Sequence, residues 1–243
     1  MKKLLLLSVL VGLMFAGFLV GRVTAPAPLY QPAALDGKDP LGAAFEDFLR
    51  AQENTIALFR DSAFFDGEQA QAEAYRGFLY ALVGAIKAGA LQSHDHPRFM
   101  RAVDWTSKSG LDNPDNNYYI AMIHDDADYR IIGNRGSTAS LVFQLVIGQP
   151  GVRGAGTSDN VSVLYDRDII TDEDGAFEII VSRQDPGPGI NWLANGEGAE
   201  TLLVRFTHSD WSGERDSRLL IEKIGEEGKP APLLTPQSMA QGL

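Results

Sequence analysis

The chain has no cysteine among its 243 residues. This absence excludes disulfide bonds, thiolate metal ligands and cysteine nucleophiles. Positive charge is also scarce, because 21 lysines and arginines stand against 32 aspartates and glutamates, for a formal net charge of −11. No run of basic residues follows Lys3. Since binding to phosphates needs clustered Lys and Arg, we expect no nucleic-acid partner and no anionic membrane surface.

Several motifs of catalysis and cofactor binding are missing too. No serine lies in a Gly-x-Ser-x-Gly elbow, so an α/β-hydrolase triad has no support. The glycine-rich stretch 148–156 lacks the strand-to-helix context of a phosphate loop. Asp172 to Gly175 begins like a calcium loop, but apolar residues follow, which predicts a hairpin turn. His94 and His96 lack a third ligand nearby and predict a solvated loop. We expect no metal and no cofactor.

One long hydrophobic run is present, and it lies at the start of the sequence. Leu4–Gly21 contains no charged residue. At ~1.5 Å per residue such a helix rises about 27 Å, close to the hydrocarbon thickness of a bilayer. The apolar core of a cleavable signal is usually shorter, about 7–15 residues. We therefore predict an uncleaved membrane anchor through residues 4–21.

The orientation follows from the charges around this run. Lys2 and Lys3 precede it and favour a cytoplasmic N-terminus. The prediction is a single-pass inner-membrane protein whose main domain is periplasmic or otherwise extracytoplasmic. Secretion after signal cleavage is the alternative, although the only candidate site, Ala25 to Ala27, is followed by an unfavourable proline, Pro28.

Composition and periodicity divide the chain into five parts: the anchor or signal (1–21), a tether rich in proline and alanine (22–39), a helical segment (40–104), a β-sandwich (105–229) and a flexible tail (230–243). Asp39 and Pro40 predict a helix start, as N-cap and first helical residue. Apolar residues every four positions predict a second helix over about 67–87. A short third helix is expected from His96 to Val103.

From Tyr118 onward the apolar period is two. Short strands with turn signals at intervals of roughly 8–12 residues are typical of a β-sandwich or jelly-roll. The first two strands flank His124 to Ala127, a composition that indicates a hairpin. Seven strands are predicted, at residues 118–123, 129–132, 140–147, 161–165, 177–181, 201–206 and 219–224.

Two groups of residues are candidates for chemistry or binding. In Leu111 to Tyr119 (LDNPDNNYY), Asp112 and Asp115 form either an Asx-turn around a rigid proline or a carboxylate pair able to hold a proton or cation. Trp192 follows the loop Asp185–Gly189, and Trp211 closes the strand that holds Arg205. An indole in such a position lines a pocket or fills a corner of the core. The residues alone leave both pairs of alternatives open.

A series of motifs in register resembles the bacterial domain of unknown function 1214, which often accompanies domain of unknown function 1254. The resemblance covers roughly Ala72 to Lys223, with small departures at Gly77 and Leu111. The motifs that carry it are Glu73–Arg76, Asp95–Phe99, Lys108–Asn116, Tyr129–Gly136, Asp174–Glu178, Asn191–Leu193, Leu203–Arg205 and Asp210–Trp211.

The resemblance implies an α+β, mainly β fold: a jelly-roll-like antiparallel β-sandwich preceded by two or three helices, here with an N-terminal transmembrane helix. It implies no reaction. Its polar and aromatic signature residues could converge on one ligand site or form a buried network that fastens the helices to the sandwich. The ligand-binding candidates are Tyr75, Arg76, Asn113, Asn116, Tyr119, Arg135, Trp192, Arg205, Asp210 and Trp211.

Three functions follow as hypotheses. The first is a membrane-tethered envelope protein that binds a small or extended ligand in a sandwich cleft. The second is a hydrolase or lyase with Asp112 or Asp115 as general base and Arg76 or Arg135 holding an anionic group. The third is a structural partner of another envelope protein, with aromatic residues at the interface.

Overall fold

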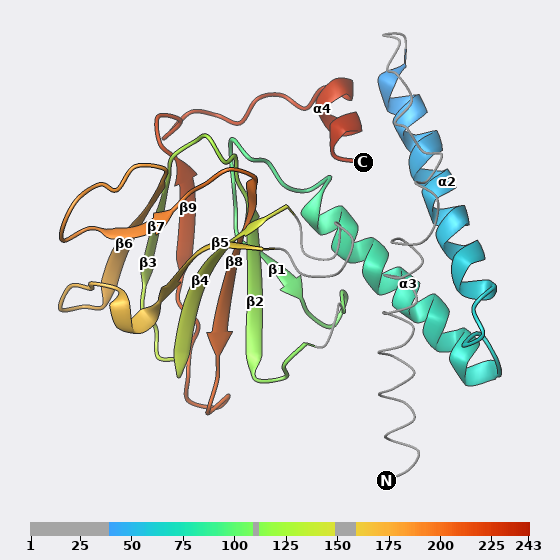
Figure 1. Cartoon of the computed structure of the whole chain (residues 1–243), viewed down its shortest axis with the longest axis horizontal. Coiled ribbons are helices and arrows are strands. Elements are labelled where there is room, and N and C mark those ends of the chain that lie inside the picture. Colours follow the sequence, from blue (N-terminus) through green and yellow to red (C-terminus); the bar gives the residue numbers. More distant parts are fainter. Residues whose placement is uncertain (1–38, 109–111, 149–158) are drawn as a thin grey trace.

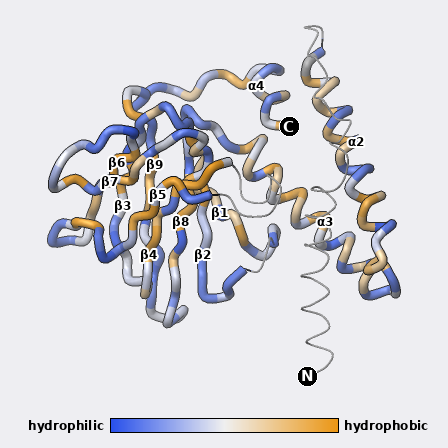
Figure 2. The backbone as a smooth tube through the Cα atoms, in the orientation of Figure 1, coloured by the Kyte–Doolittle hydropathy of each residue, from blue (hydrophilic) through white to orange (hydrophobic). Residues whose placement is uncertain are grey.

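The computed structural model describes residues 39–108, 112–148 and 159–243, and the predicted anchor lies outside them. Two helices come first, α2 (Pro40–Arg60) and α3 (Glu68–Ala88). The predicted start of α2 is confirmed: Asp39 is its N-cap, and a carboxylate oxygen accepts the Gly42 N–H at 2.8 Å. Hydrophobic and hydrophilic residues are interspersed along both helices (Figure 2), as in amphipathic helices.

The described residues contain nine strands, β1 to β9. Every strand predicted from the sequence is present, and two more are found, β1 and β7. Their bounds are β1 (Met100–Val103), β2 (Asn116–Met122), β3 (Tyr129–Asn134), β4 (Ser140–Ile147), β5 (Asn160–Tyr165), β6 (Ala176–Ser182), β7 (Asn191–Ala194), β8 (Ala199–Thr207) and β9 (Leu219–Lys223), with a 3-10 turn η1 (Asp166–Asp168) and a last helix α4 (Pro236–Gln241).

The fold is mainly β and belongs to the α+β class, with two sheets and the helices to one side (Figure 1). The order is β1-β2-β8-β4-β5 in one sheet and β7-β6-β3-β9 in the other. Neighbouring strands among the described residues are antiparallel, apart from β6 and β7, which are parallel.

The two sheets share one hydrophobic core. Alternate residues of β8, namely Leu202, Val204 and Phe206, are almost completely buried, and Phe143 of β4 and Ile131 of β3 have no exposed surface. Because strand side chains alternate between faces, this period of two directs one face of each sheet into the core. The core therefore fixes which side chains of β2 and β8 point inward near the strand ends.

The predicted hairpin at His124 to Ala127 is wrong. β2 pairs with β1 and β8, whereas β3 pairs with β6 and β9, so this connection passes from one sheet to the other. The reason is burial: Ile123 and Tyr129, on either side of the connection, both belong to the core between the sheets. Because β2 and β3 lie in different sheets, the apolar faces of both strands can pack into that core.

One further prediction is corrected, in the segment before β2. The expected helix from His96 to Val103 is instead a loop and then β1, which extends the sheet at β2. A segment this short gains more from pairing with an open sheet edge than from an isolated helical turn. In the tail, Thr235 and Ser238 form a capping box that starts α4, and α4 packs against α2 (Figure 1).

Candidate functional site

Two of the predicted site residues, Tyr75 and Arg76, lie on the helix pair, and Tyr75 joins α3 to α2. Arg60 of α2 donates from Nε to the Tyr75 hydroxyl at 2.7 Å, and the Tyr75 ring packs edge-on against Phe59. Arg76 pairs with Glu73 on its own helix. Both side chains are thus engaged within α2 and α3, away from the turn at Asp112 to Asn116.

That turn, the predicted Asx-turn, is present. Asn113 Oδ1 accepts the Asp115 N–H at 2.9 Å, and the Asn113 carbonyl accepts the Asn116 N–H at 3.0 Å. Asp112 pairs with Lys108 at 2.9 Å. The Tyr118 hydroxyl accepts from the Asn116 amide at 3.0 Å. No described arginine contacts either carboxylate, so the geometry gives the general-base hypothesis no support.

The turn is joined to the end of β8, where a buried polar cluster lies. The Asp115 carbonyl accepts the His208 N–H at 2.7 Å. The His208 ring places Nε2 2.7 Å from Asp216 Oδ1, while Asp216 Oδ2 accepts from Asn117 Nδ2 at 2.9 Å and from the Tyr119 hydroxyl at 3.1 Å. We refer to His208, Asp216, Asn117 and Tyr119 as the His208 network.

Two predicted residues cover this network. Trp211 stacks on the His208 ring with centroids 3.8 Å apart, and Asp210 caps the intervening turn by accepting the Ser212 N–H at 2.9 Å. Glu214 lies 3.6 Å from His208 Nδ1. Burial, and then the charge of Asp216, raise the pKa of Tyr119. Asp216 thus links His208, Asn117 and Tyr119 through one carboxylate, which favours a fastening role for this end of the domain, while the buried His208 Nδ1 has no hydrogen-bond partner among the described residues.

Tyr119, Asp210 and Trp211 were predicted from the sequence, whereas His208, Asp216 and Asn117 were not. The available signal was the inward row of β8: Leu202, Val204 and Phe206 are followed, two residues further, by His208. A histidine that continues a buried row needs polar partners, and only the fold shows that Asp216 supplies one.

The other two predicted arginines do not join the network. Arg135 donates from Nη2 to Asp166 at 2.6 Å and to the Thr138 carbonyl at 3.0 Å. Arg205 of β8 donates to Gln144 of β4 at 2.9 Å. Arg205 lies between Val204 and Phe206, which point into the core. Because strand side chains alternate between faces, the Arg205 side chain points away from the core. The structure therefore does not bring the predicted arginines together.

Trp192 lies at a groove. It is on the edge strand β7, half-buried, and its indole N–H donates to the Ser182 carbonyl at 3.0 Å. The groove has a volume of about 470 Å³. We call it the Trp192 groove, and its lining residues are Leu164, Asp168, Ile170, Asp185, Gly187, Pro188, Gly189, Ile190, Asn191 and Trp192.

The wall of the Trp192 groove is fixed by its backbone. The buried Asn191 donates to the carbonyls of Ile170, at 2.8 Å, and Glu178, at 2.9 Å, and accepts the Ile170 N–H at 2.6 Å. Gly187 and Gly189, with φ of 104° and 83°, adopt left-handed conformations that favour glycine. The proline between them restricts the loop further. The groove is therefore largely preformed.

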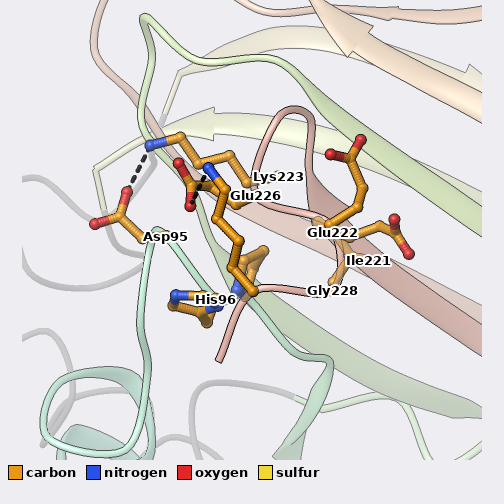
Figure 3. A pocket seen from close by; sticks show the side chains of 10 residues that line it. Asp95, His96, Ile221, Glu222, Lys223, Glu226 and Gly228 are labelled. Atoms are coloured by element: carbon orange, nitrogen blue, oxygen red, sulfur yellow. Dashed lines mark hydrogen bonds and ion pairs between the residues drawn. The ribbon is translucent and has the colours of Figure 1, made fainter. Parts of the chain in front are cut away.

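A second, smaller cavity of about 170 Å³ lies between the segment before β1 and the end of β9 (Figure 3). Two ion pairs border it: Lys223 with Asp95, at 2.5 Å, and Lys229 with Glu226, at 3.1 Å. Figure 3 shows the Lys223 side chain reaching Asp95. Both lysines are already paired, so this cavity offers a ligand little beyond its shape.

Beside this cavity, the rings of His94 and His124 stack with centroids 4.8 Å apart. Among residues 39–108, 112–148 and 159–243, no group of three or more His, Asp or Glu is arranged to hold a metal ion. Burial, and then the neighbouring His124, lower the pKa of His94. His94 is thus placed to respond to acid.

We expect His94 to make the domain less stable between pH 7 and 5. Its folded pKa lies below its unfolded value of ~6.5, so the unfolded chain binds the proton more tightly and stability falls as pH drops through that range. Urea unfolding midpoints of the full chain at pH 5, 6 and 7 test this. His94→Gln should flatten the decline, whereas His96→Gln, which removes an imidazole outside the stack, should not. Equal slopes in all three proteins would refute the role of His94.

The described residues thus define a mainly β, two-sheet domain with a helix pair and a preformed groove at one sheet edge. No family model and no curated protein matches the chain. Within the described parts, no helix is long and apolar enough to cross a membrane.

Similarity is found among solved structures. An uncharacterised protein from Burkholderia cenocepacia is 27% identical, with a TM-score of 0.74, and the match covers 83% of this chain and 55% of that one. A protein from Vibrio parahaemolyticus is 15% identical, with a TM-score of 0.38 over 83% of this chain and 57% of that one, too low a score to indicate a shared arrangement. The chain therefore spans little more than half the length of either protein.

Proposed function

We propose that this is a ligand-binding domain and that the Trp192 groove is its binding site. In this proposal residues 4–21 anchor the protein in the inner membrane and the domain lies on the extracytoplasmic side, which the uninterrupted apolar run and the two preceding lysines support. We also propose that the two sheets form a jelly-roll-like β-sandwich of the domain of unknown function 1214 type, as the motif series suggests.

One observation carries the binding proposal: a tryptophan held by a hydrogen bond forms part of a groove of ligand size. Small-molecule sites usually have volumes of about 300–1,000 Å³ and combine apolar walls with a few polar groups. The groove, at about 470 Å³, combines Leu164, Ile170 and Trp192 with the carboxylates of Asp168 and Asp185.

Rigidity supports the same proposal. A site that is already in its bound shape loses less conformational entropy when a ligand enters. Here Asn191 ties Ile170 to β6 and β7, and the Asp185 carboxylate accepts the Gly187 N–H at 2.8 Å, which closes the turn beside the groove. Ile170 and Ile190 remain exposed by 58% and 45%, apolar surface that a ligand would cover.

Fluorine NMR of the full chain labelled with 5-fluorotryptophan tests the proposal. The sequence contains three tryptophans, so three resonances are expected, and Trp192→Phe assigns the relevant one. The chain is held in phosphatidylglycerol nanodiscs and titrated with cyclohexanol, phenol, methyl glucoside, hexanoate and choline. We expect at least one compound to shift the Trp192 resonance saturably and to leave that of Trp211 unchanged.

Trp211 is the matched control, because it lies on the His208 ring and outside the Trp192 groove. A resonance of Trp192 that none of the five compounds moves, or saturable shifts confined to the other tryptophans, would overturn the proposal.

A further inference from the structure

We infer that the ligand of the Trp192 groove is a small organic cation, an ammonium group that carries alkyl substituents. This inference rests on the proposed function of the groove and adds the chemical class of its ligand. Three features of the groove carry it: the sign of its charges, the unused capacity of its carboxylates, and the indole between apolar walls.

The charged groups that line the groove are both acidic. Asp168 and Asp185 stand on it, and no lysine, arginine or histidine is among its lining residues. A bound carboxylate or phosphate would meet two negative charges without a counter-ion, which disfavours anions. The formal net charge of the whole chain, −11, attracts cations to the surface in general.

Asp168 has only a weak partner. Its carboxylate is 57% exposed and lies 3.7 Å from Arg167 Nε. The Arg167 guanidinium in turn lies over the ring of Tyr165, 4.6 Å from the centroid. At that distance and exposure an ion pair contributes little, so the carboxylate stays available to a ligand cation.

Asp185 is placed by its own turn and keeps acceptor capacity. One oxygen, Oδ1, accepts the Gly187 N–H at 2.8 Å. An ionised carboxylate has two oxygens and about four acceptor positions. Asp185 can therefore hold the loop and still accept from, or lie beside, an ammonium group.

Trp192 and its apolar neighbours can contact both the charge and the alkyl groups of such a ligand. The negative face of an indole attracts a cation, and an alkylammonium group also buries its methyl or methylene groups against it. The exposed surfaces of Ile170 and Ile190 add apolar contact in the same groove. A hydrated metal ion would leave these apolar walls without a partner, which favours an organic cation.

The test compares choline with its uncharged isostere 3,3-dimethylbutan-1-ol, and n-butylammonium with n-butanol. Binding to the full chain in phosphatidylglycerol nanodiscs is measured by titration calorimetry and by the Trp192 fluorine resonance. We expect each cation to bind about tenfold more tightly than its neutral counterpart.

Charge-neutralising variants locate the effect. Asp168→Asn and Asp185→Asn keep the side-chain shape, and in Asp185→Asn the amide oxygen can still accept the Gly187 N–H. Each should weaken choline binding several-fold and leave binding of the uncharged isostere unchanged. Glu173→Gln is the matched control, because it makes the same charge change at an exposed turn residue outside the groove. It should leave both affinities unchanged.

The outcomes separate the two proposals. If the uncharged isosteres bind in the groove as tightly as the cations, the inference about the ligand fails and the proposed binding function stands. If Glu173→Gln weakens choline binding as much as Asp185→Asn does, the preference is a general charge effect and the inference also fails. If none of these compounds or of the earlier panel moves the Trp192 resonance, both proposals fail.

Discussion

Asp216→Ala is expected to lower the free energy of unfolding by about 3 kcal/mol. The substitution removes the one carboxylate that accepts from Asn117, Tyr119 and the His208 ring. His208 and Asn117 are buried, at 6% and 8% exposure, so water does not readily replace the lost acceptor. The loss should appear as a lower urea midpoint of the full chain at pH 7, followed by circular dichroism.

Two further variants separate the network from the loop that carries it. Asp216→Asn keeps one carbonyl oxygen but turns an amide toward the donors, so its loss should be intermediate. Asp210→Ala removes an exposed carboxylate that caps a turn in the same loop, and its loss should be clearly smaller than that of Asp216→Ala. Equal losses for Asp210→Ala and Asp216→Ala would show that the loop, not the network, determines the stability.

This experiment also decides between the two roles that the sequence left open for the polar and aromatic signature residues, a ligand site or a fastening network. If the His208 network is a fastening, ligand shifts at Trp192 should persist in Asp216→Asn, because the groove has none of its lining residues in the network. If Asp216→Asn has normal stability but no longer binds the ligand, the binding site lies at this end of the domain instead.

Local features of the sequence predicted local structure well. The stripe over 67–87 gave α3 (Glu68–Ala88), and Asp39 with Pro40 gave the start of α2, because caps and amphipathic periods depend on residues close in sequence. Asp172 forms the predicted turn, accepting the N–H groups of Asp174, at 3.0 Å, and Ala176, at 2.8 Å.

Pairing between distant strands could not be predicted in this way. β7 (Asn191–Ala194) has four residues between a Gly-Pro loop and Asn195-Gly196, too few for a visible period of two, and its partner β6 ends before that loop. Without β7, Trp192 could be interpreted as a core or a pocket residue. Its half-buried position on an edge strand shows why either interpretation fitted the sequence.

The candidate site depended on the same long-range information. Asp168 and Asp185 carried no motif, and only the approach of η1 to the Gly-Pro loop places them on one groove. The predicted arginines, by contrast, lie in motifs of the sequence, but in the structure each has a separate partner. Arg76 pairs with Glu73 on its own helix and Arg205 with Gln144 of the neighbouring strand β4, whereas Arg135 pairs with Asp166 of η1.

The attachment of α3 to the sheets includes a partly buried ion pair, that of Lys87 with Asp104. Lys87 Nζ lies 2.7 Å from Asp104 Oδ2 and 2.8 Å from Ser107 Oγ, and both charged side chains are only 16% exposed. The other carboxylate oxygen, Oδ1, accepts the N–H groups of Thr106, at 2.7 Å, and Ser107, at 3.1 Å. Burial favours the protonated acid, but the hydrogen bonds from Lys87 and Thr106 outweigh it and hold the pKa of Asp104 well below its usual range.

Asp104→Ala should therefore cost about 3 kcal/mol of unfolding free energy at pH 7, since it leaves the partly buried ammonium group of Lys87 without its counter-charge. Because the folded pKa of Asp104 is depressed, its stabilisation is present above the unfolded value of ~3.9 and is lost as pH falls below it. Asp112→Ala is the control: its pair with Lys108 is 28% and 47% exposed, and its removal should cost less than about 1 kcal/mol.

A double-mutant cycle with Lys87→Met distinguishes the ion pair from the turn that Asp104 also caps. If the pair dominates, Lys87→Met should relieve part of the cost of Asp104→Ala, because the uncompensated ammonium is gone, and the double variant should lose less than the sum of the single losses. If the two losses simply add, Asp104 acts through the N–H groups of Thr106 and Ser107. Helix α3 would then be held by its apolar face. The low pKa of Asp104 would be caused by the hydrogen bonds within the turn and not by Lys87.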